Sequence, residues 1–192
     1  YSFDGKQWRV IQAWNGPGSY QLYSTLHWQD KLLLAHYPSG YLWDFDGAGG
    51  VELNDWPPCL EGLSHLSREA QTTMIYGGDL YVGVWPWAEV WRYDADEEQW
   101  GFITRLISHP KSSDKTTHPY DVEVDEHNKA NAMQYQSNAW GQRCAGMSAV
   151  GDSLMISKSA KWTWPANMQP GFITEDQRME YARITKLTVP GN

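Results

Sequence analysis

The sequence predicts an all-β fold built from repeated four-stranded antiparallel units, on three observations. A segment at residues 27–46 recurs without a gap 48 positions later, at residues 75–94. Each copy alternates short apolar runs with Gly, Asp and Pro, which is the composition of strands joined by tight turns. A repeat of about 40–50 residues is typical of the blades of a β-propeller. We therefore predict an all-β propeller of four-stranded blades.

The two copies agree in identity as well as in character. The residues that are identical at this offset are Leu32/Leu80, Pro38/Pro86, Trp43/Trp91 and Asp46/Asp94. A third copy begins at residues 146–156 and closes at 181–187, and the opening residues 1–5 match residues 43–47. The chain is therefore expected to begin within a repeat.

Each unit has the same expected order of elements. The first strand ends at a tight turn, a second apolar strand leads to a corner, and an aromatic third strand follows. The turns are Gln29–Asp30, Gly77–Gly78 and Gly151–Asp152, and the weaker fourth strands are expected around Trp8, Val51–Leu53 and Trp100–Leu106. Helical periodicity is seen only weakly, at Glu175–Tyr181. Four aspartates are expected to end strands as Asx turns, namely Asp44, Asp46, Asp94 and Asp96.

These boundaries predict a single propeller domain, or a fragment of one. It comprises a partial blade at 1–14, blades at 17–56, 66–107 and 145–190, and a long insertion at 108–144. A four-bladed ring closed by the N-terminal strand is one interpretation. We favour part of a larger ring of about seven blades, because a half-ring would expose sheet edges.

Composition excludes several classes of function. The 192 residues carry 23 acidic and 15 basic side chains, a formal net charge of −8, which argues against a nucleic-acid partner. Twelve Trp and 11 Tyr argue against disorder. No apolar run approaches the roughly 20 residues of a membrane helix, so no membrane partner is expected, and no signal peptide is visible. Cys59 and Cys144 are expected to be small unpaired apolar residues, with a disulfide as the alternative.

The unusual residues fall on one predicted face, where corners and blade connections emerge. This face would carry Asn15, His36, Tyr37, Trp85, Trp87, His118, Tyr120, Arg143 and Lys161. Aromatic rings pack on the C–H faces of sugars, and cations bind carboxylates or sulfates, so an anionic polysaccharide is the expected partner. Trp43 and Trp91 are instead expected in the core between blades, with ligand contact as the alternative. For His36, Trp85 and Trp87 a structural role and a ligand contact stay equally open.

No cofactor is required by this prediction. A structural metal ion held by His109, His118, His127 and Cys144 is a weaker hypothesis, since all four lie in the insertion but match no known ligand spacing. The alternative is that the histidines lie on the surface of a polar loop.

The Gly-Asp turns and the aromatic third strands resemble kelch-type blades. Together with the Trp85-Pro86-Trp87 corner and the insertion's Thr-His-Pro-Tyr and Trp-Gly-Gln-Arg stretches, they resemble bacterial β-propeller polysaccharide lyases that cleave uronate polymers such as ulvan. The resemblance covers blade architecture over most of the chain. It implies β-elimination by a secreted or periplasmic enzyme.

The resemblance also implies a division of roles. Arg143 and Asn15 would hold the uronate carboxylate, His36 would act as base and Tyr120 as acid. Tyr76 with Arg92 is a rival Tyr/Arg pair on the opposite face. The residues expected to bind substrate are Tyr37, Trp85, Trp87, His118 and Lys161. The alternative function is a kelch-like module that binds a glycan or a protein without catalysis, and the partner could equally be further blades or a second copy.

Overall fold

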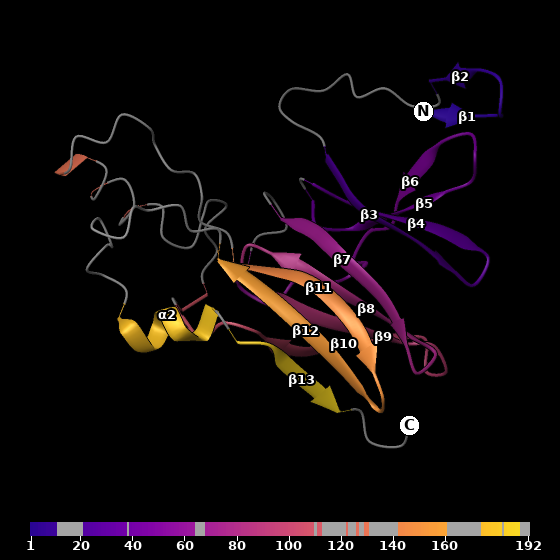
Figure 1. The fold of residues 1–192 in the computed structure, drawn as a ribbon. Helices are drawn as coiled ribbons and strands as arrows, with labels where there is room; N and C mark the ends of the chain where they lie inside the picture. The colour runs from indigo at the N-terminus through magenta and orange to yellow at the C-terminus, as the bar shows by residue number, and fades with distance from the viewer. Residues whose placement is uncertain are drawn as a thin grey trace.

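The computed structural model describes residues 1–10, 21–37, 39–63, 68–109, 111–112, 122, 126, 129–130, 142–160, 174–181 and 183–188. These residues form antiparallel sheets and a short helix, α2 (Glu175–Tyr181), which confirms the all-β class (Figure 1). No helix among them is long and apolar enough to cross a membrane.

Three sheets follow one another along the chain, after an N-terminal hairpin of β1 (Ser2–Phe3) and β2 (Trp8–Arg9). Sheet 1 contains β3 (Gln21–Trp28), β4 (Lys31–Tyr37), β5 (Leu42–Phe45) and β6 (Gly50–Glu52). Sheet 2 contains β7 (Glu69–Tyr76), β8 (Asp79–Trp85), β9 (Glu89–Asp94) and β10 (Gln99–Arg105). Sheet 3 contains β11 (Gln142–Val150), β12 (Ser153–Ala160) and β13 (Thr185–Thr188). Sheets 1 and 2 thus have the predicted four strands in sequence order.

The repeat seen in the sequence is also a repeat in strand register. Ala35 pairs with Leu42 in sheet 1, and Gly83 pairs with Val90, 48 positions later, in sheet 2. The first strand of every sheet has a register shift at the same place, after Leu22, Ala70 and Cys144. A residue of sheet 1 therefore corresponds to the residue 48 positions later in sheet 2, and a residue of sheet 2 to the one 74 positions later in sheet 3.

One boundary differs from the prediction. Gln142, Arg143 and Cys144, assigned to the insertion from sequence, belong to β11 because they pair with Ala160, Ser159 and Lys158 of β12. Arg143 is therefore held by a strand and not by a loop.

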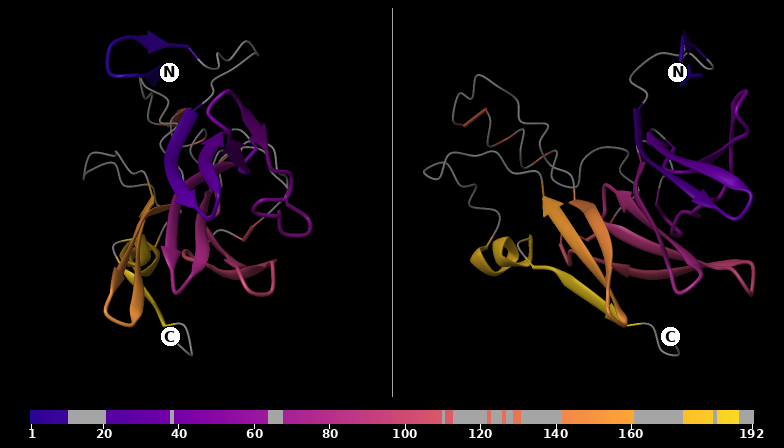
Figure 2. Two further views of the ribbon diagram at one scale, coloured as in Figure 1. Left: turned by 90° about the vertical axis from the view of Figure 1, so that its right-hand side faces the viewer. Right: turned by 45° about the vertical axis from the view of Figure 1, so that its right-hand side comes forward.

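The sheets are stacked face to face, with β7 lying between β3 and β11 (Figures 1 and 2). We call the face that a sheet turns to its successor the forward face, and the opposite one the rear face. The forward face of sheet 1 (Leu33, Ala35, Leu42) packs on the rear face of sheet 2 (Leu80, Val82, Val84), and all six residues are completely buried. Tyr81 and Val90 on the forward face of sheet 2 pack in turn with Cys144, Leu154 and Ile156 of sheet 3. Figure 2 shows the N-terminal hairpin beyond sheet 1 and α2 beside sheet 3.

Very close approach of neighbouring sheets is made possible by a small residue at one position of the second strand. A Cβ atom added to Gly83 would lie 2.6 Å from the Sγ atom of Cys144. The Oγ1 atom of Thr72 donates a hydrogen bond of 2.7 Å to the carbonyl oxygen of Cys144, which ties β11 to β7 at the same level. The corresponding residue of sheet 1 is Ala35, which is also completely buried.

The corner after the second strand is a second joint between sheets. Ser39 forms a parallel bridge to Arg68, and Trp87, 48 positions after Ser39, forms one to Gln142. The next residue has a positive φ in both corners, 73° at Gly40 and 52° at Ala88. Each corner is thus bridged to a residue at the start of the following sheet.

A buried ion pair lies behind the first of these corners. Arg68 donates a hydrogen bond of 2.7 Å to Glu89, and both side chains are at most 2% exposed. The indole nitrogen of Trp91 donates to the same carboxylate oxygen at 2.7 Å. Trp91 is 5% exposed, which confirms its predicted place in the core, whereas Trp43 is only half-buried.

The predicted Asx turns form after two of the four aspartates. Asp46 accepts hydrogen bonds from the backbone of Ala48 and Gly49, and Asp94 from that of Asp96 and Glu97. Asp44 was assigned wrongly: it lies inside β5 and forms an ion pair of 2.7 Å with Lys31. At the corresponding positions of sheet 2 the charges are reversed, and Arg92 binds Asp79 at 2.6 Å.

Substitution of Gly83 by Ala tests the close approach of sheets 2 and 3. We expect a loss of about 2 kcal/mol in the free energy of unfolding, because the added methyl group overpacks a tight contact. The matched control is Gly101→Ala, where the nearest atom to an added Cβ is the Arg92 carbonyl oxygen at 4.0 Å. Chemical denaturation of both variants measures the difference, and equal losses would contradict the role given to Gly83.

Candidate functional site

The structure describes five of the predicted site residues and two of the weaker metal candidates with their side chains. These are His36, Tyr37, Trp85, Trp87, His109, Arg143 and Cys144. Asn15, His118, Tyr120, His127 and Lys161 lie outside the described residues.

Three of the described residues occupy the same end of successive sheets. Tyr37 pairs with Gln21, Trp85 with Glu69, and Arg143 with Ser159. Each pair lies where the first strand of a sheet begins and the second strand ends. We call this the corner end of the sheets, and Tyr37, Trp85 and Arg143 are all partly exposed there.

A polar group that we call the first-strand cluster lies at the corner end, formed by Tyr23, Glu69, Gln71 and Arg143. Tyr23 and Gln71 are the extra residues at the register shifts of β3 and β7, and Glu69 and Arg143 occupy corresponding positions in β7 and β11. Gln71 donates a hydrogen bond to Glu69, whose carboxylate lies 3.6 Å from the Arg143 guanidinium. The cluster thus joins all three first strands.

The electrostatics of the cluster leave a cation and a neutral phenol side by side. Burial and the neighbouring Glu69 raise the pKa of Tyr23, so its hydroxyl stays protonated and donates a hydrogen bond of 2.6 Å to Gln21. The Arg143 side chain is 28% exposed, and its buried Nε atom has no hydrogen-bond partner among the described residues. The exposed part of the guanidinium is where an incoming carboxylate could bind.

His36 belongs to a separate buried group on the rear face of sheet 1. Its Nε2 atom lies 3.2 Å from the Glu52 carboxylate and 3.3 Å from the Ser39 hydroxyl. Trp43 packs edge-on against the imidazole at 5.0 Å and donates to Glu52. Burial lowers the pKa of His36, and the side chain is only 1% exposed. These contacts are those of a structural histidine, the alternative left open by the sequence.

The two corner tryptophans differ in accessibility. Trp87 is 3% exposed, and the Arg105 guanidinium lies 4.9 Å from the centre of its ring. Arg105 also donates a hydrogen bond of 3.0 Å to the Trp87 carbonyl oxygen. Trp85 is only partly buried, so at this corner it is the ring with surface to offer a ligand.

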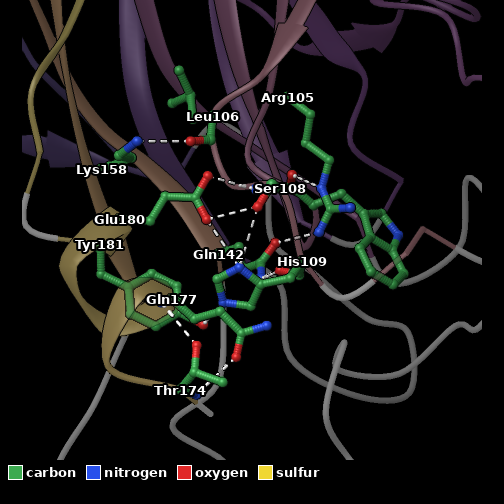
Figure 3. Close-up of polar contacts among 11 residues, drawn as sticks. Arg105, Leu106, Ser108, His109, Gln142, Lys158, Thr174, Gln177, Glu180 and Tyr181 are labelled. Carbon is green, nitrogen blue, oxygen red and sulfur yellow. Dashed lines mark hydrogen bonds and ion pairs between the residues drawn. The ribbon is translucent and has the colours of Figure 1, made fainter.

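A second polar group, the histidine cluster, connects the end of sheet 2 to helix α2 (Figure 3). The Nδ1 atom of His109 lies 2.9 Å from the Glu180 carboxylate, and its Nε2 atom lies 3.0 Å from the Tyr181 hydroxyl. The backbone and hydroxyl of Ser108 donate to the same carboxylate at 2.8 and 2.9 Å. This carboxylate–imidazole–phenol chain holds α2 against the segment that follows β10.

The histidine cluster is continuous with the start of β11. The Gln142 side chain donates to the His109 carbonyl oxygen and accepts a hydrogen bond of 2.6 Å from Arg105. Gln142 is 2% exposed and directly precedes Arg143. These buried hydrogen bonds of Gln142 therefore fix the strand next to Arg143 and connect it to the histidine cluster.

Burial governs the charges in the histidine cluster. It lowers the pKa of His109, although Glu180 opposes the shift. Burial alone would raise the pKa of Glu180, but the hydrogen bonds from Ser108, together with His109 and Lys158, lower it on balance. Near neutral pH the pair is thus a neutral imidazole beside a carboxylate.

The described residues do not form a metal centre. Both ring nitrogens of His109 face protein partners, and burial raises the pKa of the Cys144 thiol to about 12, whereas thiolate is the form that binds metals. No group of three potential ligands occurs in the described ranges. The metal hypothesis therefore depends on residues outside them.

The rival pair lies at the other end of sheet 2. Tyr76 pairs with Asp79 at the hairpin turn and is 8% exposed. Arg92 binds Asp79 at 2.6 Å and Asp94 at 2.9 Å. Two carboxylates already occupy this guanidinium, so it is less suited than Arg143 to bind an anionic ligand.

Several residues of these clusters were not singled out from sequence. Tyr23 and Gln71 occupy the same repeat position, 48 residues apart at the bulge of the first strand, but they differ in residue type, so only their shared position could have pointed to them. Glu180 and Tyr181 carried no such signal, since their partners lie 72 residues away.

The burial of His109 predicts a dependence of stability on pH. Its pKa is lower in the folded than in the unfolded chain, so folding is favoured fully above the unfolded pKa of about 6.5 and less as the pH falls below it. His109→Gln removes this protonation. We therefore expect the free energy of unfolding of the variant to fall less than that of the wild type between about pH 7 and pH 5. Urea denaturation at several pH values measures the free energy of unfolding, and His27→Gln, at an exposed position, is the control. An unchanged slope for His109→Gln would refute the assignment.

Comparison with known proteins adds no family to this description. No protein-family model, no curated protein and no solved structure matches the chain. The function must therefore be argued from the clusters themselves.

Proposed function

We propose that the three sheets are blades of a β-propeller whose corner end binds an anionic polysaccharide containing uronate. The observation that carries this proposal is the partly exposed Arg143 guanidinium, which lies 3.6 Å from the carboxylate of Glu69 on the neighbouring first strand. The common strand order and forward-to-rear packing support the blade architecture. Such polymers are met outside the cytoplasm, in keeping with a secreted or periplasmic protein.

The chemistry around Arg143 suits a sugar acid. A guanidinium can bind a carboxylate through two parallel hydrogen bonds. Tyr23, Tyr37 and Trp85 lie at the same end of the sheets and are each only partly buried, so their rings can pack on sugar C–H faces. Because the chain is acidic overall, a polyanion must be held by a local cation, and Arg143 is that cation.

Cleavage by β-elimination is a second candidate, favoured by the protonated phenol of Tyr23 beside Glu69 and Arg143. Arg143 would neutralise the uronate carboxylate and so acidify the C5 proton. The Glu69 carboxylate would take that proton, the C5–H electron pair would form the C4–C5 double bond, and the C4–O bond would break. Tyr23 would protonate the departing oxygen. In this scheme Arg143 keeps the role inferred from sequence, whereas His36 is replaced as base because its imidazole faces Glu52 and Ser39 in a separate group.

Replacement of Arg143 by Gln tests the binding site. We expect affinity for a polyuronate such as polygalacturonate or ulvan to fall about 10- to 100-fold, the effect of losing a charged hydrogen-bonding partner. Isothermal titration calorimetry measures it. Arg92→Gln, at the opposite end, is the matched control and should bind as the wild type does. No binding by the wild type, or equal losses in both variants, would overturn the proposal.

Replacement of Tyr23 by Phe separates catalysis from binding. If the site is a lyase, the rate of formation of the unsaturated, ultraviolet-absorbing product should fall about 10²- to 10⁴-fold, while affinity changes little. Tyr76→Phe, at the hairpin end, should retain the wild-type rate. A wild-type protein that binds the polymer but releases no unsaturated product would instead be the non-catalytic binding module.

A further inference from the structure

We propose that Tyr181 is a nucleophile that accepts the acyl group of a carboxylic ester, with His109 as its base. This role is independent of polysaccharide binding and of the first-strand cluster. It rests on the carboxylate–imidazole–phenol chain that connects α2 to the segment after β10 (Figure 3). A nucleophile, a base within hydrogen-bond reach and a third group that orients the base are the arrangement that covalent catalysis requires.

The hydrogen bonds of Glu180 determine which nitrogen of His109 carries the proton. Burial would raise the pKa of Glu180, but two hydrogen bonds from Ser108, at 2.8 and 2.9 Å, together with His109 and Lys158 lower it. An ionised carboxylate can only accept, so the Nδ1 atom of His109, 2.9 Å away, is the donor. The Nε2 atom of the neutral imidazole is then an acceptor, and the Tyr181 hydroxyl donates to it at 3.0 Å. The phenol is thus hydrogen-bonded to a base.

The phenol lies on the accessible side of this chain. His109 is only 8% exposed, whereas Tyr181 is partly exposed. The base is therefore largely shielded from water, while the nucleophile has surface that a substrate can meet.

The surrounding charges favour an uncharged acyl group over a phosphate as the electrophile. Arg105, which acts on the imidazole, and Lys158, which acts on the carboxylate, each donate to a backbone carbonyl oxygen, at 3.0 and 2.7 Å. Phosphoryl transfer depends on cations that neutralise the anionic oxygens of the transferred group. An ester carbonyl needs no such neutralisation before it is attacked, so an ester is the substrate class that suits this cluster.

The proposed reaction has two stages. The Tyr181 oxygen attacks the carbonyl carbon of the ester while its proton passes to the Nε2 atom of His109. The bond between that carbon and the alcohol oxygen then breaks, and the leaving alcohol takes the proton from the imidazole. Water, activated by the same imidazole, can then hydrolyse the acyl-tyrosine, which is a phenyl ester, and release the carboxylic acid. Glu180 is a positioning residue, because it holds the imidazole in the required tautomer.

Acetylation by p-nitrophenyl acetate tests the nucleophile. Peptide mass spectrometry after an acid quench locates the acetyl groups, and the released nitrophenolate is followed by its absorbance. We expect Tyr181 to be acetylated at least about tenfold faster than free N-acetyltyrosinamide, since a general base contributes about 10²–10⁴-fold. Tyr93, which is also partly exposed but packs among tryptophans, is the internal control and should react no faster than the free compound. A phenol held only for structure would react more slowly than the free compound, and that result would overturn the proposal.

Replacement of His109 by Gln separates the base from the hydrogen bond. The amide oxygen can still accept from Tyr181 but cannot take its proton, so acetylation of Tyr181 should fall at least about tenfold. Tyr81, which is completely buried, should stay unmodified in every variant and so reports that the fold is intact. An unchanged rate at Tyr181 in the folded variant would refute the role of His109. Continued release of nitrophenolate beyond one equivalent, if Tyr181→Phe abolishes it, would show that the acyl-tyrosine turns over.

Replacement of Glu180 by Gln tests the positioning residue through the pH profile. Burial lowers the pKa of His109 and Glu180 opposes that shift. Without the carboxylate the imidazole should protonate at lower pH, so the pH at which acetylation of Tyr181 slows should also move lower. A merely structural contact would leave this pH unchanged, and an unchanged pH would contradict the role of Glu180.

Discussion

The structure depends on how closely the first strand of one sheet can approach the second strand of the sheet before it. At Gly83 the neighbouring Cys144 leaves no space for a side chain, and Thr72 locks the two strands together by a hydrogen bond. This short distance brings the starts of the first strands together. Arg143 can then reach Glu69, and Tyr23 can be influenced by both, although the three residues belong to three different sheets.

Much of the fold could be predicted because its information is local and repeated. The turns at Gln29, Gly77 and Gly151 all have positive φ, and the 48-residue offset found in the sequence is the offset of the strand pairs themselves. The short helix was visible as a weak periodicity at its observed bounds. Sequence alone does not show what a side chain contacts within a sheet, so a structural and a catalytic role for His36 both stayed open until its contacts with Glu52 and Trp43 were seen.

Only the site residues that lie in the repeated strands could be predicted from the sequence. Arg143 was expected at the corner end and is there, but the insertion before it obscured the fact that β11 already begins at Gln142. The partners of His109 come from α2, far along the chain, and no spacing rule relates them. For Trp87 a structural role and a ligand contact were both open from sequence, and the structure shows the ring 3% exposed with the Arg105 guanidinium over it.

The bond between Gln142 and the His109 carbonyl oxygen has a consequence for the long segment between them. It fastens the two chain ends where that segment leaves and re-enters the fold, with Arg105 bracing the same amide. The entropy of closing a loop rises only slowly with its length once its ends are fixed by the fold, by about 0.6 kcal/mol per doubling. The framework of sheets can thus accept a shorter or longer connection between His109 and Gln142 with little thermodynamic penalty.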